Sequence, residues 1–414
     1  MVPKLRFAEF SGSWIKDKIS SFIKDGFIIG HLDGNHGALY PRSEEFSQNG
    51  VPYISATDFS SGEVDFNSCK YLPISRANQF KKGIAKSGDV LFAHNATVGP
   101  VSLLNTNHDF VILSTTATYF RCDTNKLNNV FLKNSLEGEH FVKQYSSIMS
   151  QSTRNQVPIT AQRDLIISVP NIREQNKIAY FLSAVDDKIT LLKKQYDLLC
   201  HYKKSMMQKI FSQELRFKDD NGDEFPEWEE VELKKIASKV NTKNRDNSVT
   251  TVLTNSATQG IVSQESYFER EIVTESNLTG YYVVRIGDFV YNPRISSTAP
   301  VGPIKMNELT QGVMSPLYTV FRFKKGLLKF YQYFFESSVW HDYMKSVANS
   351  GARHDRMNIS GADFFGLPVP EPFEEEQTKI AHFLSAIDDK ITTKKTELDK
   401  LKTWKQGLLQ QMFV

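Results

Sequence analysis

Two small groups of residues have types and spacing that catalysis could use, and neither group is complete. Glu232 and Lys234 are separated by one residue, as in the Glu-x-Lys core of metal-dependent nucleases, but no positioned partner carboxylate accompanies them. His31 and His36 could bind a metal ion, yet no second pair of ligands is evident. We therefore expect Glu232 and Lys234 on a solvated helix face and the two histidines in a polar surface loop.

The motifs that usually bind phosphates or cofactors are missing. The sequence has no G-x-x-x-x-G-K-[ST] loop, no G-x-G-x-x-G after a strand, and no [DNS]-P-P-[YFW] tetrapeptide of amino-methyltransferases. Its three cysteines, Cys69, Cys122 and Cys200, are widely spaced, which argues against a disulfide framework or a zinc site. No uncharged apolar run approaches the ~18–20 residues that a membrane span needs. We expect a cytoplasmic chain that binds no catalytic metal or cofactor and has no membrane partner.

Polar loops in both halves of the chain carry groups that can pair with the edges of DNA bases. Arg can pair bidentately with guanine, and Asn or Gln with adenine. Ordinary loop polarity is the alternative, but such loops occur at equivalent places in both halves. The candidate DNA-binding residues are His94, Asn95, Thr97, Ser152, Arg154, Asn155 and Gln156 in the first half, and Asn292, Arg294, Ser296, Arg353, His354, Arg356 and Asn358 in the second.

The overall composition neither requires nor excludes a nucleic-acid partner. The 414 residues include 50 Lys and Arg and 47 Asp and Glu, which gives a formal net charge of +3. With 40% hydrophobic and 23% charged residues, the chain is a normal globular mixture, so wholesale disorder and a basic tail protein are excluded. Local patches, and not the net charge, set the field that a phosphate backbone experiences.

The sequence contains an internal duplication. Residues 174–212 and 376–414 align without a gap at an offset of 202, and 20 of the 39 aligned positions are identical. Weaker echoes include Leu-Arg-Phe at 5–7 and 215–217, and Gly-Asp at 88–89 and 287–288. The order is a variable module, a repeated segment, a second variable module and the repeated segment again. We predict segments at 1–170, 171–213, 214–370 and 371–414.

Each repeated segment is predicted to be one long helix. Apolar residues recur at alternating steps of three and four, with Lys203, Lys394 and Lys405 in the same register, which is typical of a coiled-coil seam. The recurring Asp-Asp pairs at 186–187 and 388–389 fall outside this stripe and are expected to be solvated or to face a partner. The predicted helix-pair interface is Leu182, Val185, Ile189, Leu192, Tyr196, Leu199, Met206, Ile210, Leu384, Ile387, Ile391, Leu398, Leu401, Leu408 and Met412.

Chain geometry predicts that the two helices pair antiparallel. The second module joins the end of the first helix to the start of the second, and domain termini usually lie close together. Short apolar or β-branched runs separated by Gly and Asn turns, such as 51–54 and 111–113, precede helix-like stretches at 128–149 and 327–348. This order predicts α+β modules. The predicted fold is α+β, with two globular domains at opposite ends of a pair of long antiparallel coiled-coil helices, related by a pseudo-twofold axis. The alternative is that each helix packs only onto its own module.

The repeat resembles a known family. The pattern Glu-Gln-x-Lys-Ile-Ala-x-Phe-Leu-Ser-x-x-Asp-x-Lys-Ile, at 174–189 and 376–391, is similar to the central and distal conserved regions of the specificity subunit of Type I restriction-modification enzymes. The preceding Val-Pro at 169–170 and 369–370 and the Gly-Asp pairs also match. The resemblance covers the whole chain in the order and spacing of its four segments.

This resemblance implies a non-catalytic DNA-recognition subunit with two target recognition domains. Each domain would read one half of a bipartite, asymmetric site in double-stranded DNA. The helices would fix the spacer and dock two methyltransferase subunits, which bind S-adenosylmethionine and methylate adenine. Restriction subunits would supply translocation and cleavage with ATP and Mg²⁺. The alternatives are a stand-alone nuclease or methyltransferase with diverged motifs, and a coiled-coil adaptor without sequence-selective DNA binding.

Overall fold

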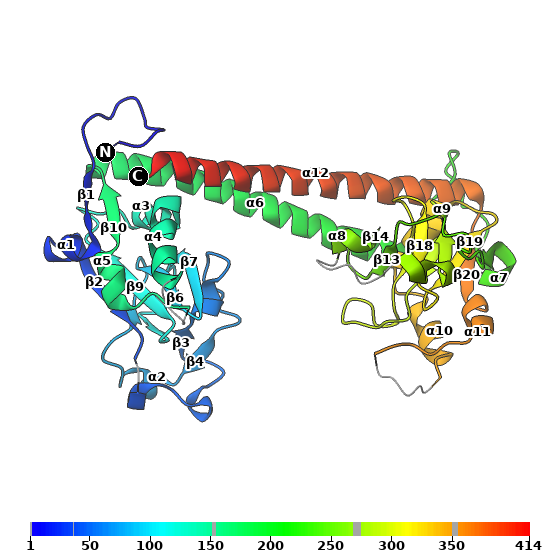
Figure 1. The fold of residues 1–414 in the computed structure, drawn as a ribbon, viewed down its shortest axis with the longest axis horizontal. Helices are drawn as coiled ribbons and strands as arrows, with labels where there is room; N and C mark the ends of the chain where they lie inside the picture. The colour runs from blue at the N-terminus through cyan, green and yellow to red at the C-terminus, as the bar shows by residue number, and fades with distance from the viewer. Residues whose placement is uncertain (1, 36, 151–154, 268–274, 350–354) are drawn as a thin grey trace. The chain divides into compact units, whose positions relative to one another are not determined.

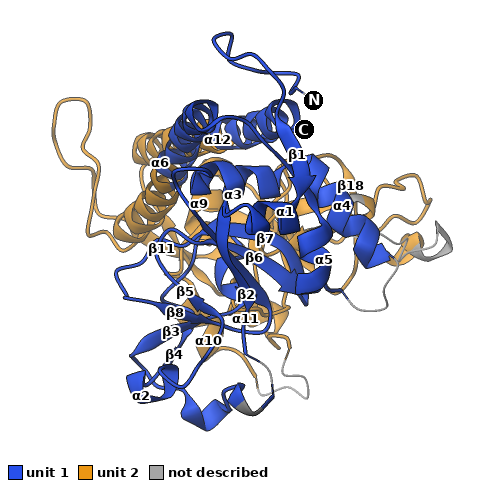
Figure 2. Cartoon of the chain, turned by 90° about the vertical axis from the view of Figure 1, so that its left-hand side faces the viewer, with its two compact units in different colours: residues 1–193, 396–414 blue, residues 194–395 orange. Residues whose placement is uncertain are grey.

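The computed structural model describes residues 2–35, 37–150, 155–267, 275–349 and 355–414. The chain forms two compact units (Figure 2): unit 1 comprises residues 1–193 and 396–414, and unit 2 comprises residues 194–395. Two long helices, α6 (Ile172–Phe211) and α12 (Glu374–Met412), each contribute one half to each unit (Figure 1). None of the described helices is both long enough and apolar enough to cross a membrane.

Unit 1 is built on two four-stranded sheets. The first has the order β2-β9-β6-β7 and is antiparallel, and the second has the order β4-β3-β8-β5 with a parallel β3–β8 pair. Its strands are β1 (Ile15–Lys18), β2 (Ile28–Asp33), β3 (Val51–Ile54), β4 (Lys70–Leu72), β5 (Ile84–Ala85), β6 (Val90–Asn95), β7 (Thr97–Leu103), β8 (Val111–Leu113), β9 (Ala117–Cys122) and β10 (Ile166–Val169). Its shorter helices are α1 (Ile19–Lys24), α2 (Ile74–Ala77), α3 (Asn129–Glu137), α4 (Glu139–Ser150) and α5 (Ile159–Asp164).

Unit 2 repeats the first of these sheets. Its order β12-β19-β16-β17 matches β2-β9-β6-β7, while smaller two-stranded sheets replace the second one. The strands are β11 (Glu229–Glu232), β12 (Ala237–Lys239), β13 (Leu253–Ser256), β14 (Gly260–Ser263), β15 (Tyr282–Val284), β16 (Phe289–Tyr291), β17 (Ile304–Met306), β18 (Gly312–Met314), β19 (Thr319–Phe323) and β20 (Pro368–Glu371). The helices are α7 (Leu233–Ile236), α8 (Gln264–Tyr267), α9 (Leu328–Glu336), α10 (His341–Ser346) and α11 (Gly361–Phe365). Sheets and helices in both units confirm the predicted α+β class.

Within each unit, the start of one long helix packs against the end of the other. In unit 1 the core joins Ile178 and Leu182 of α6 to Leu408 and Met412 of α12. In unit 2 the core joins the end of α6 to the start of α12 in the same antiparallel sense. Both cores also include module side chains, so these helix segments pack onto the modules as well as onto each other.

The residues predicted for the helix-pair interface divide into two groups by exposure. The buried ones are Leu182, Val185, Ile210, Leu384, Ile387, Leu398, Leu408 and Met412. The partly buried ones are Ile189, Leu192, Tyr196, Leu199, Met206, Ile391 and Leu401. Complete burial of a side chain of this size contributes roughly 1.5–3 kcal/mol, so the buried group dominates the apolar stabilisation.

A buried carboxylate at the start of each long helix holds the segment that enters the module. Glu174 is fully buried; Arg6 donates to both of its oxygens at 2.7 Å, and the Trp14 indole N–H donates at 3.2 Å. In unit 2 the fully buried Glu376 accepts hydrogen bonds from Arg216 at 3.0 and 2.8 Å and from Trp228 at 2.8 Å. The recurring Leu-Arg-Phe and the following Trp therefore serve one contact, which we call the Glu–Arg–Trp contact.

The next residue of each repeat binds the module's main chain. The Gln175 amide accepts from the Asn128 N–H at 2.8 Å and donates to the Pro170 carbonyl at 2.8 Å. Gln377 accepts from the Leu327 N–H at 2.9 Å and donates to the Pro372 carbonyl at 2.8 Å. Asn128 and Leu327 are the N-caps of α3 and α9. The repeated Glu-Gln pair thus joins each long helix to its module.

The repeated Gly-Asp pair is a structural turn. Gly88 and Gly287 have φ of 91° and 85°, a region that favours glycine. The buried Asp89 carboxylate is bound by both guanidinium branches of Arg121 on β9, at 2.9 and 2.6 Å. Asp288 is bound in the same way by Arg322 on β19. The central strands of the two sheets are therefore anchored identically.

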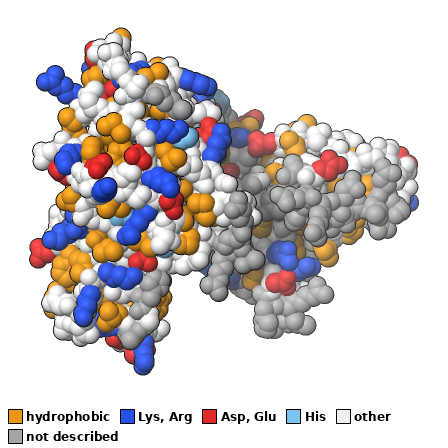
Figure 3. Space-filling model, turned by 60° about the vertical axis from the view of Figure 1, so that its left-hand side comes forward, with side chains coloured by type: hydrophobic (Ala, Val, Ile, Leu, Met, Phe, Trp, Pro, Cys, Tyr) orange, Lys and Arg blue, Asp and Glu red, His pale blue; other side chains and the backbone are white. Residues whose placement is uncertain are grey.

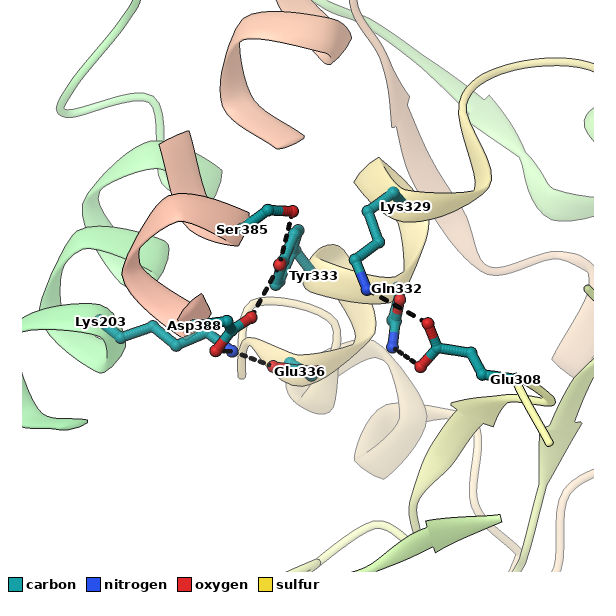
Figure 4. Close-up of polar contacts among 8 residues, drawn as sticks. All are labelled: Lys203, Glu308, Lys329, Gln332, Tyr333, Glu336, Ser385 and Asp388. Atoms are coloured by element: carbon teal, nitrogen blue, oxygen red, sulfur yellow. Dashed lines mark hydrogen bonds and ion pairs between the residues drawn. The ribbon is translucent and has the colours of Figure 1, made fainter. Parts of the chain in front are cut away.

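Lys203, which stands in the apolar register of α6, is paired with two carboxylates (Figure 4). Its ammonium lies 2.7 Å from Asp388 on α12 and 2.9 Å from Glu336 on α9, and its side chain is 14% exposed. Tyr333 donates a hydrogen bond to the second Asp388 oxygen at 2.7 Å and lies 3.0 Å from Ser385 Oγ. Burial alone would lower the pKa of Lys203, but the two carboxylates outweigh it and raise the pKa.

An equivalent cluster in unit 1 corrects one expectation. Lys405 lies 2.7 Å from Asp186 and 3.4 Å from Glu137, and Lys133 contacts the same two carboxylates at 3.6 and 3.0 Å. Both Asp-Asp pairs were expected to be solvated or to face a partner. Asp187 and Asp389 are exposed, but the expectation was wrong for Asp186 and Asp388, which are paired within the chain. Asp388 on α12 pairs with Lys203 on α6, and Asp186 on α6 pairs with Lys405 on α12. Antiparallel packing brings these residues together, because the first half of each long helix lies beside the second half of the other.

The Glu–Arg–Trp contact predicts a large effect of a single truncation. We expect Glu376→Ala to lower the free energy of unfolding of unit 2 by about 1–3 kcal/mol, because the partly buried Arg216 guanidinium and the buried Trp228 indole N–H lose their shared acceptor. Chemical denaturation of the full chain measures this change. Glu374→Ala is the matched control, since Glu374 is exposed in the first turn of the same helix. Equal effects of the two variants would contradict a stabilising role for the contact.

Candidate nucleic-acid interface

In unit 1 the structure joins two of the predicted polar loops. Asn95, the last residue of β6, forms an antiparallel bridge with Gln156. The Ala96 N–H donates to the Asn155 carbonyl at 3.1 Å, and the Val157 N–H donates to the His94 carbonyl at 2.8 Å. Ala96, with φ of 63°, forms the tip between β6 and β7. Two segments about 60 residues apart in the chain therefore form one surface.

Unit 2 forms the same bridge at the equivalent place. Arg294 pairs with Arg356, the Ile295 N–H donates to the Asp355 carbonyl at 3.0 Å, and the Met357 N–H donates to the Pro293 carbonyl at 2.9 Å. We call these two surfaces the bridged loops of units 1 and 2. Their side chains differ although their main-chain pairing is the same.

In unit 1 the candidate residues have different roles in the structure. His94 is 6% exposed, so it lies beneath the loop surface and not on it. The exposed Asn155 donates its amide to the Ala96 carbonyl at 3.0 Å and thereby stabilises the loop itself. Asn95, Thr97 and Gln156 are partly exposed, and among the described residues the side chains of Asn95 and Gln156 make no hydrogen bond. Asn95 and Gln156 are therefore free to bind a ligand, as is Thr97, whose side chain also makes no hydrogen bond to the described residues.

In unit 2 the candidate residues surround a hollow of about 320 Å³ that Asn292, Arg294, Ser296 and Arg356 help to line. Asn292 accepts from the Arg294 N–H and donates to the Asn255 carbonyl, both at 3.0 Å, so it shapes the loop. Ser296 likewise accepts from the Ala299 N–H at 3.1 Å.

The exposed side of the unit 2 loop is charged. The Arg294 and Arg356 side chains lie 3.9 and 3.6 Å from the exposed carboxylate of Asp355. Asn358 is exposed nearby in the chain. Ser152, Arg154, Arg353 and His354 lie outside the residues that the structure describes. The two arginines are thus the unit 2 counterparts of Asn95 and Gln156.

The hollow also contains residues that the sequence analysis did not select. Asn255 is 3% exposed and donates to the carbonyls of Val290 and Pro303 at 2.7 and 3.2 Å. Thr254 lies 3.1 Å from the Tyr318 hydroxyl, and both line the hollow. The only signal in the sequence is a Thr-Asn-Ser run within the short strand β13, which does not indicate its neighbours in space.

Beneath the unit 1 loop lies a buried polar cluster centred on His31. Its ring stacks on Phe120 with centroids 4.4 Å apart, and its Nε2 lies 3.1 Å from Gln162 Oε1. Gln162 also donates to Thr118 and to the Val157 carbonyl, which adjoins the bridge. The expectation that His31 lies in a surface loop was wrong, because it is part of the buried face of β2. His36 lies outside the described residues.

The other chemical candidates remain simple surface features. Glu232 and Lys234 form an exposed ion pair at 2.8 Å. Only Lys234 lies on a helix, α7; the expectation of a helix face was wrong for Glu232, which is the last residue of β11. Within the described part of the chain, no group of three or more His, Cys, Asp or Glu side chains is arranged to hold a metal ion. Figure 3 shows Lys and Arg side chains spread over the face in view, among acidic and apolar ones. The polar bridged loops are therefore the best candidate sites in the described residues.

Comparisons with known proteins agree on one family. A family model described as "Type I restriction modification DNA specificity domain" matches residues 25–199 and 226–403. The chain is 26% identical over 384 residues to the type I restriction enzyme MjaX specificity subunit of Methanocaldococcus jannaschii, covering 87% of this chain and 85% of that one.

Two solved structures share the fold. A chain from a structure on complex assembly and conformational transition of the type I R-M system has a TM-score of 0.57 at 16% identity, covering 97% of this chain and 98% of that chain. The Type-I restriction-modification system S subunit from M. genitalium has a TM-score of 0.54 at 15% identity, with 100% and 99% coverage. At these identities the likeness shows the fold alone.

The His31 cluster predicts a loss of stability in acid. Burial, the largest cause, lowers the pKa of His31 to about 4, against about 6.5 in an unfolded chain. Between these values the unfolded state binds more protons, so stability is complete above pH 6.5 and falls as the pH falls toward 4. We expect unit 1 to lose about 2 kcal/mol from His31 between pH 7 and pH 5.

Hydrogen exchange of the β2 and β9 amides measures this loss in the full chain. His31→Gln should remove that part of the pH dependence, whereas His201→Gln, at an exposed position on α6, should leave it unchanged. An identical pH dependence in wild type and His31→Gln would show that His31 does not titrate in this way.

Proposed function

This chain belongs to the Type I restriction modification DNA specificity family, and we propose that it is the non-catalytic DNA-recognition subunit of such a system. The recognition domain of each unit binds one half of a bipartite, asymmetric site in double-stranded DNA. The observation that carries this proposal is the matched pair of bridged loops: one main-chain pairing, repeated on a duplicated sheet, presents different side chains. Two bridged loops with the same main-chain geometry and different side chains can bind two half-sites of different sequence.

The long helices set the spacer between half-sites and dock two methyltransferase subunits. On α6 the exposed apolar side chains Tyr180, Leu191, Leu198 and Tyr202 are separated by 11, 7 and 4 residues, each close to a whole number of helical turns. Exposed apolar residues aligned in this way are typical of protein-interaction surfaces. They support α6 as a docking element for partner subunits.

Catalysis in this proposal resides on those partners. The methyltransferase subunits bind S-adenosylmethionine and methylate adenine, and restriction subunits with ATP and Mg²⁺ translocate and cleave DNA. The role of this chain is to select the sequence and to hold the modifying subunits over it. The DNA itself is bound at the bridged loops, where base edges can be reached from the major groove.

Long-read methylation mapping tests this function. In cells that express the chain with its methyltransferase partner, we expect methylated adenine only within one bipartite motif with a fixed spacer. Cells that express the partner alone should lack this motif. Methylation without sequence selection, or methyl transfer by the isolated chain, would contradict a non-catalytic recognition role.

The spacer is expected to follow the length of the helices. Removing residues 193–199 from α6 and 392–398 from α12 deletes one heptad from each helix and keeps its apolar register. In an antiparallel pair, the residue numbers of facing positions have a constant sum, and this sum is 591 for both Lys203–Asp388 and Lys405–Asp186. Residues 193–199 therefore match residues 392–398. Seven residues correspond to ~10.5 Å of helix, or about 3 base pairs.

Methylation mapping should then show both half-sites with a spacer shortened by about 3 base pairs. Copurification with the methyltransferase subunits reports whether the complex still assembles. Full activity with the original spacer would contradict the ruler function of the helices.

A further inference from the structure

The two bridged loops occupy the same position on the duplicated sheet. Phe92 on β6 pairs with Thr118 and Val101, and Tyr291 on β16 pairs with Thr319 and Ile304. The bridge residues Asn95 and Arg294 each follow three residues after these matched positions, Phe92 and Tyr291. The Asp–Arg pairs that anchor β6 and β16 are also the same in both units. The two bridges can therefore be compared residue by residue.

An antiparallel bridge places its two side chains together. Residues directly opposite each other have Cβ atoms about 4.5–5.5 Å apart and project to the same face. Asn95 and Gln156 thus form one pair in unit 1, and Arg294 and Arg356 form the corresponding pair in unit 2. Each unit presents two neighbouring side chains of a single chemical class.

These classes prefer different bases. A carboxamide accepts from N6–H and donates to N7 of adenine, whereas a guanidinium donates two parallel hydrogen bonds to O6 and N7 of guanine. Asn95 and Gln156 have both amide groups available among the described residues, because neither side chain is used to hold the loop. The amide that holds the unit 1 loop belongs to Asn155 instead.

The unit 2 pair has further features of a base-reading site. Asp355 lies within 4 Å of both guanidinium groups, so it can orient them and partly offset their mutual repulsion. Both arginines line the 320 Å³ hollow, whose wall includes the buried Asn255. At the unit 1 bridge the corresponding side chains are uncharged.

We propose, on the basis of the proposed function, that the bridge pair of each unit determines one base class in its half-site. Asn95 and Gln156 select adenine in the half-site of unit 1. Arg294 and Arg356 select guanine in the half-site of unit 2. The two copies of the scaffold therefore read different base pairs because different side chains stand at the same bridge.

A contact to phosphates is the rival explanation for the arginines, and a conservative substitution separates the two. Lysine keeps the positive charge but lacks the planar fork that matches O6 and N7 of guanine. Arg294→Lys with Arg356→Lys should therefore retain the salt dependence of binding, weaken binding to the wild-type motif, and lose discrimination at one G·C pair. Asn95→Leu with Gln156→Met keeps similar side-chain size in unit 1 and removes the hydrogen bonds to adenine.

The experiment begins with the bipartite motif that methylation mapping gives for the wild-type complex. The complex of this chain with its methyltransferase partner is then tested in competition binding against duplexes that carry every single base-pair substitution. We expect the unit 1 double variant to lose roughly tenfold to a hundredfold of discrimination at an A·T pair of one half-site. The unit 2 double variant should lose as much at a G·C pair of the other half-site.

Each variant carries an internal control, because discrimination in the half-site of the other unit should not change. Retained discrimination in either variant, or a loss at the other base class, would overturn the inference. Guanine discrimination that survives both Arg→Lys substitutions would assign the arginines to phosphates. If the wild-type complex has no bipartite motif, the proposed function fails; if it has one and the variants act otherwise, only the assignment of base classes fails.

Discussion

The buried Glu–Arg–Trp contact is the interaction on which each unit depends. A carboxylate without solvent exposure is costly to bury unless it is fully paired, and Glu174 and Glu376 are each paired with a guanidinium and an indole N–H. The contact can form only when the entering segment lies against the first turn of a long helix. The adjacent Gln then binds the N-cap of the module helix. Two consecutive side chains therefore fix how each module meets its long helix.

The second constraint is the pair of largely buried lysines, whose side chains are 14% and 15% exposed. An ammonium in an apolar register is destabilising unless carboxylates meet it, so Lys203 and Lys405 restrict the register to one in which Asp388 and Asp186 lie opposite. Apolar residues alone would tolerate a shift of one heptad with little loss, whereas a shifted lysine would lose both partners. Polar groups in helix-pair seams are known to specify register at some cost in stability. A chain whose proposed role is to measure distance requires that specification.

Much of the fold could be predicted because its signals are local. The duplication, the 3–4 spacing of apolar residues and several strands, such as Val51–Ile54 and Val111–Leu113, follow from patterns within a few turns or residues. The helix-like stretch 128–149 was less accurate, since Gly138 ends α3 and α4 begins at Glu139. The parallel β3–β8 pairing joins segments almost 60 residues apart, and no local pattern specifies it.

The candidate site shows the same division between local and distant signals. Loop polarity selected Asn95, Gln156, Arg294 and Arg356, but it does not predict their pairing across each bridge, which depends on strands that are distant in the sequence. The same polarity also selected His94, which the fold buries. Residue type and sequence spacing cannot distinguish a side chain that stabilises a loop by hydrogen bonds within it from a side chain that is available to a ligand.

The features that the two duplicated units share are those on which their packing depends, whereas the bridge side chains differ. The sheet order, the Asp–Arg anchors and the Glu–Arg–Trp contacts are repeated, because each one bears on packing that both units share. The bridge side chains lie at the end of β6 and just after β16, where Arg294 is exposed and Asn95, Gln156 and Arg356 are partly exposed. Asn95 and Gln156 can therefore be exchanged for Arg294 and Arg356 at the same main-chain geometry. The residues that stabilise the fold are therefore the same in both units, whereas the residues proposed to determine specificity differ between them.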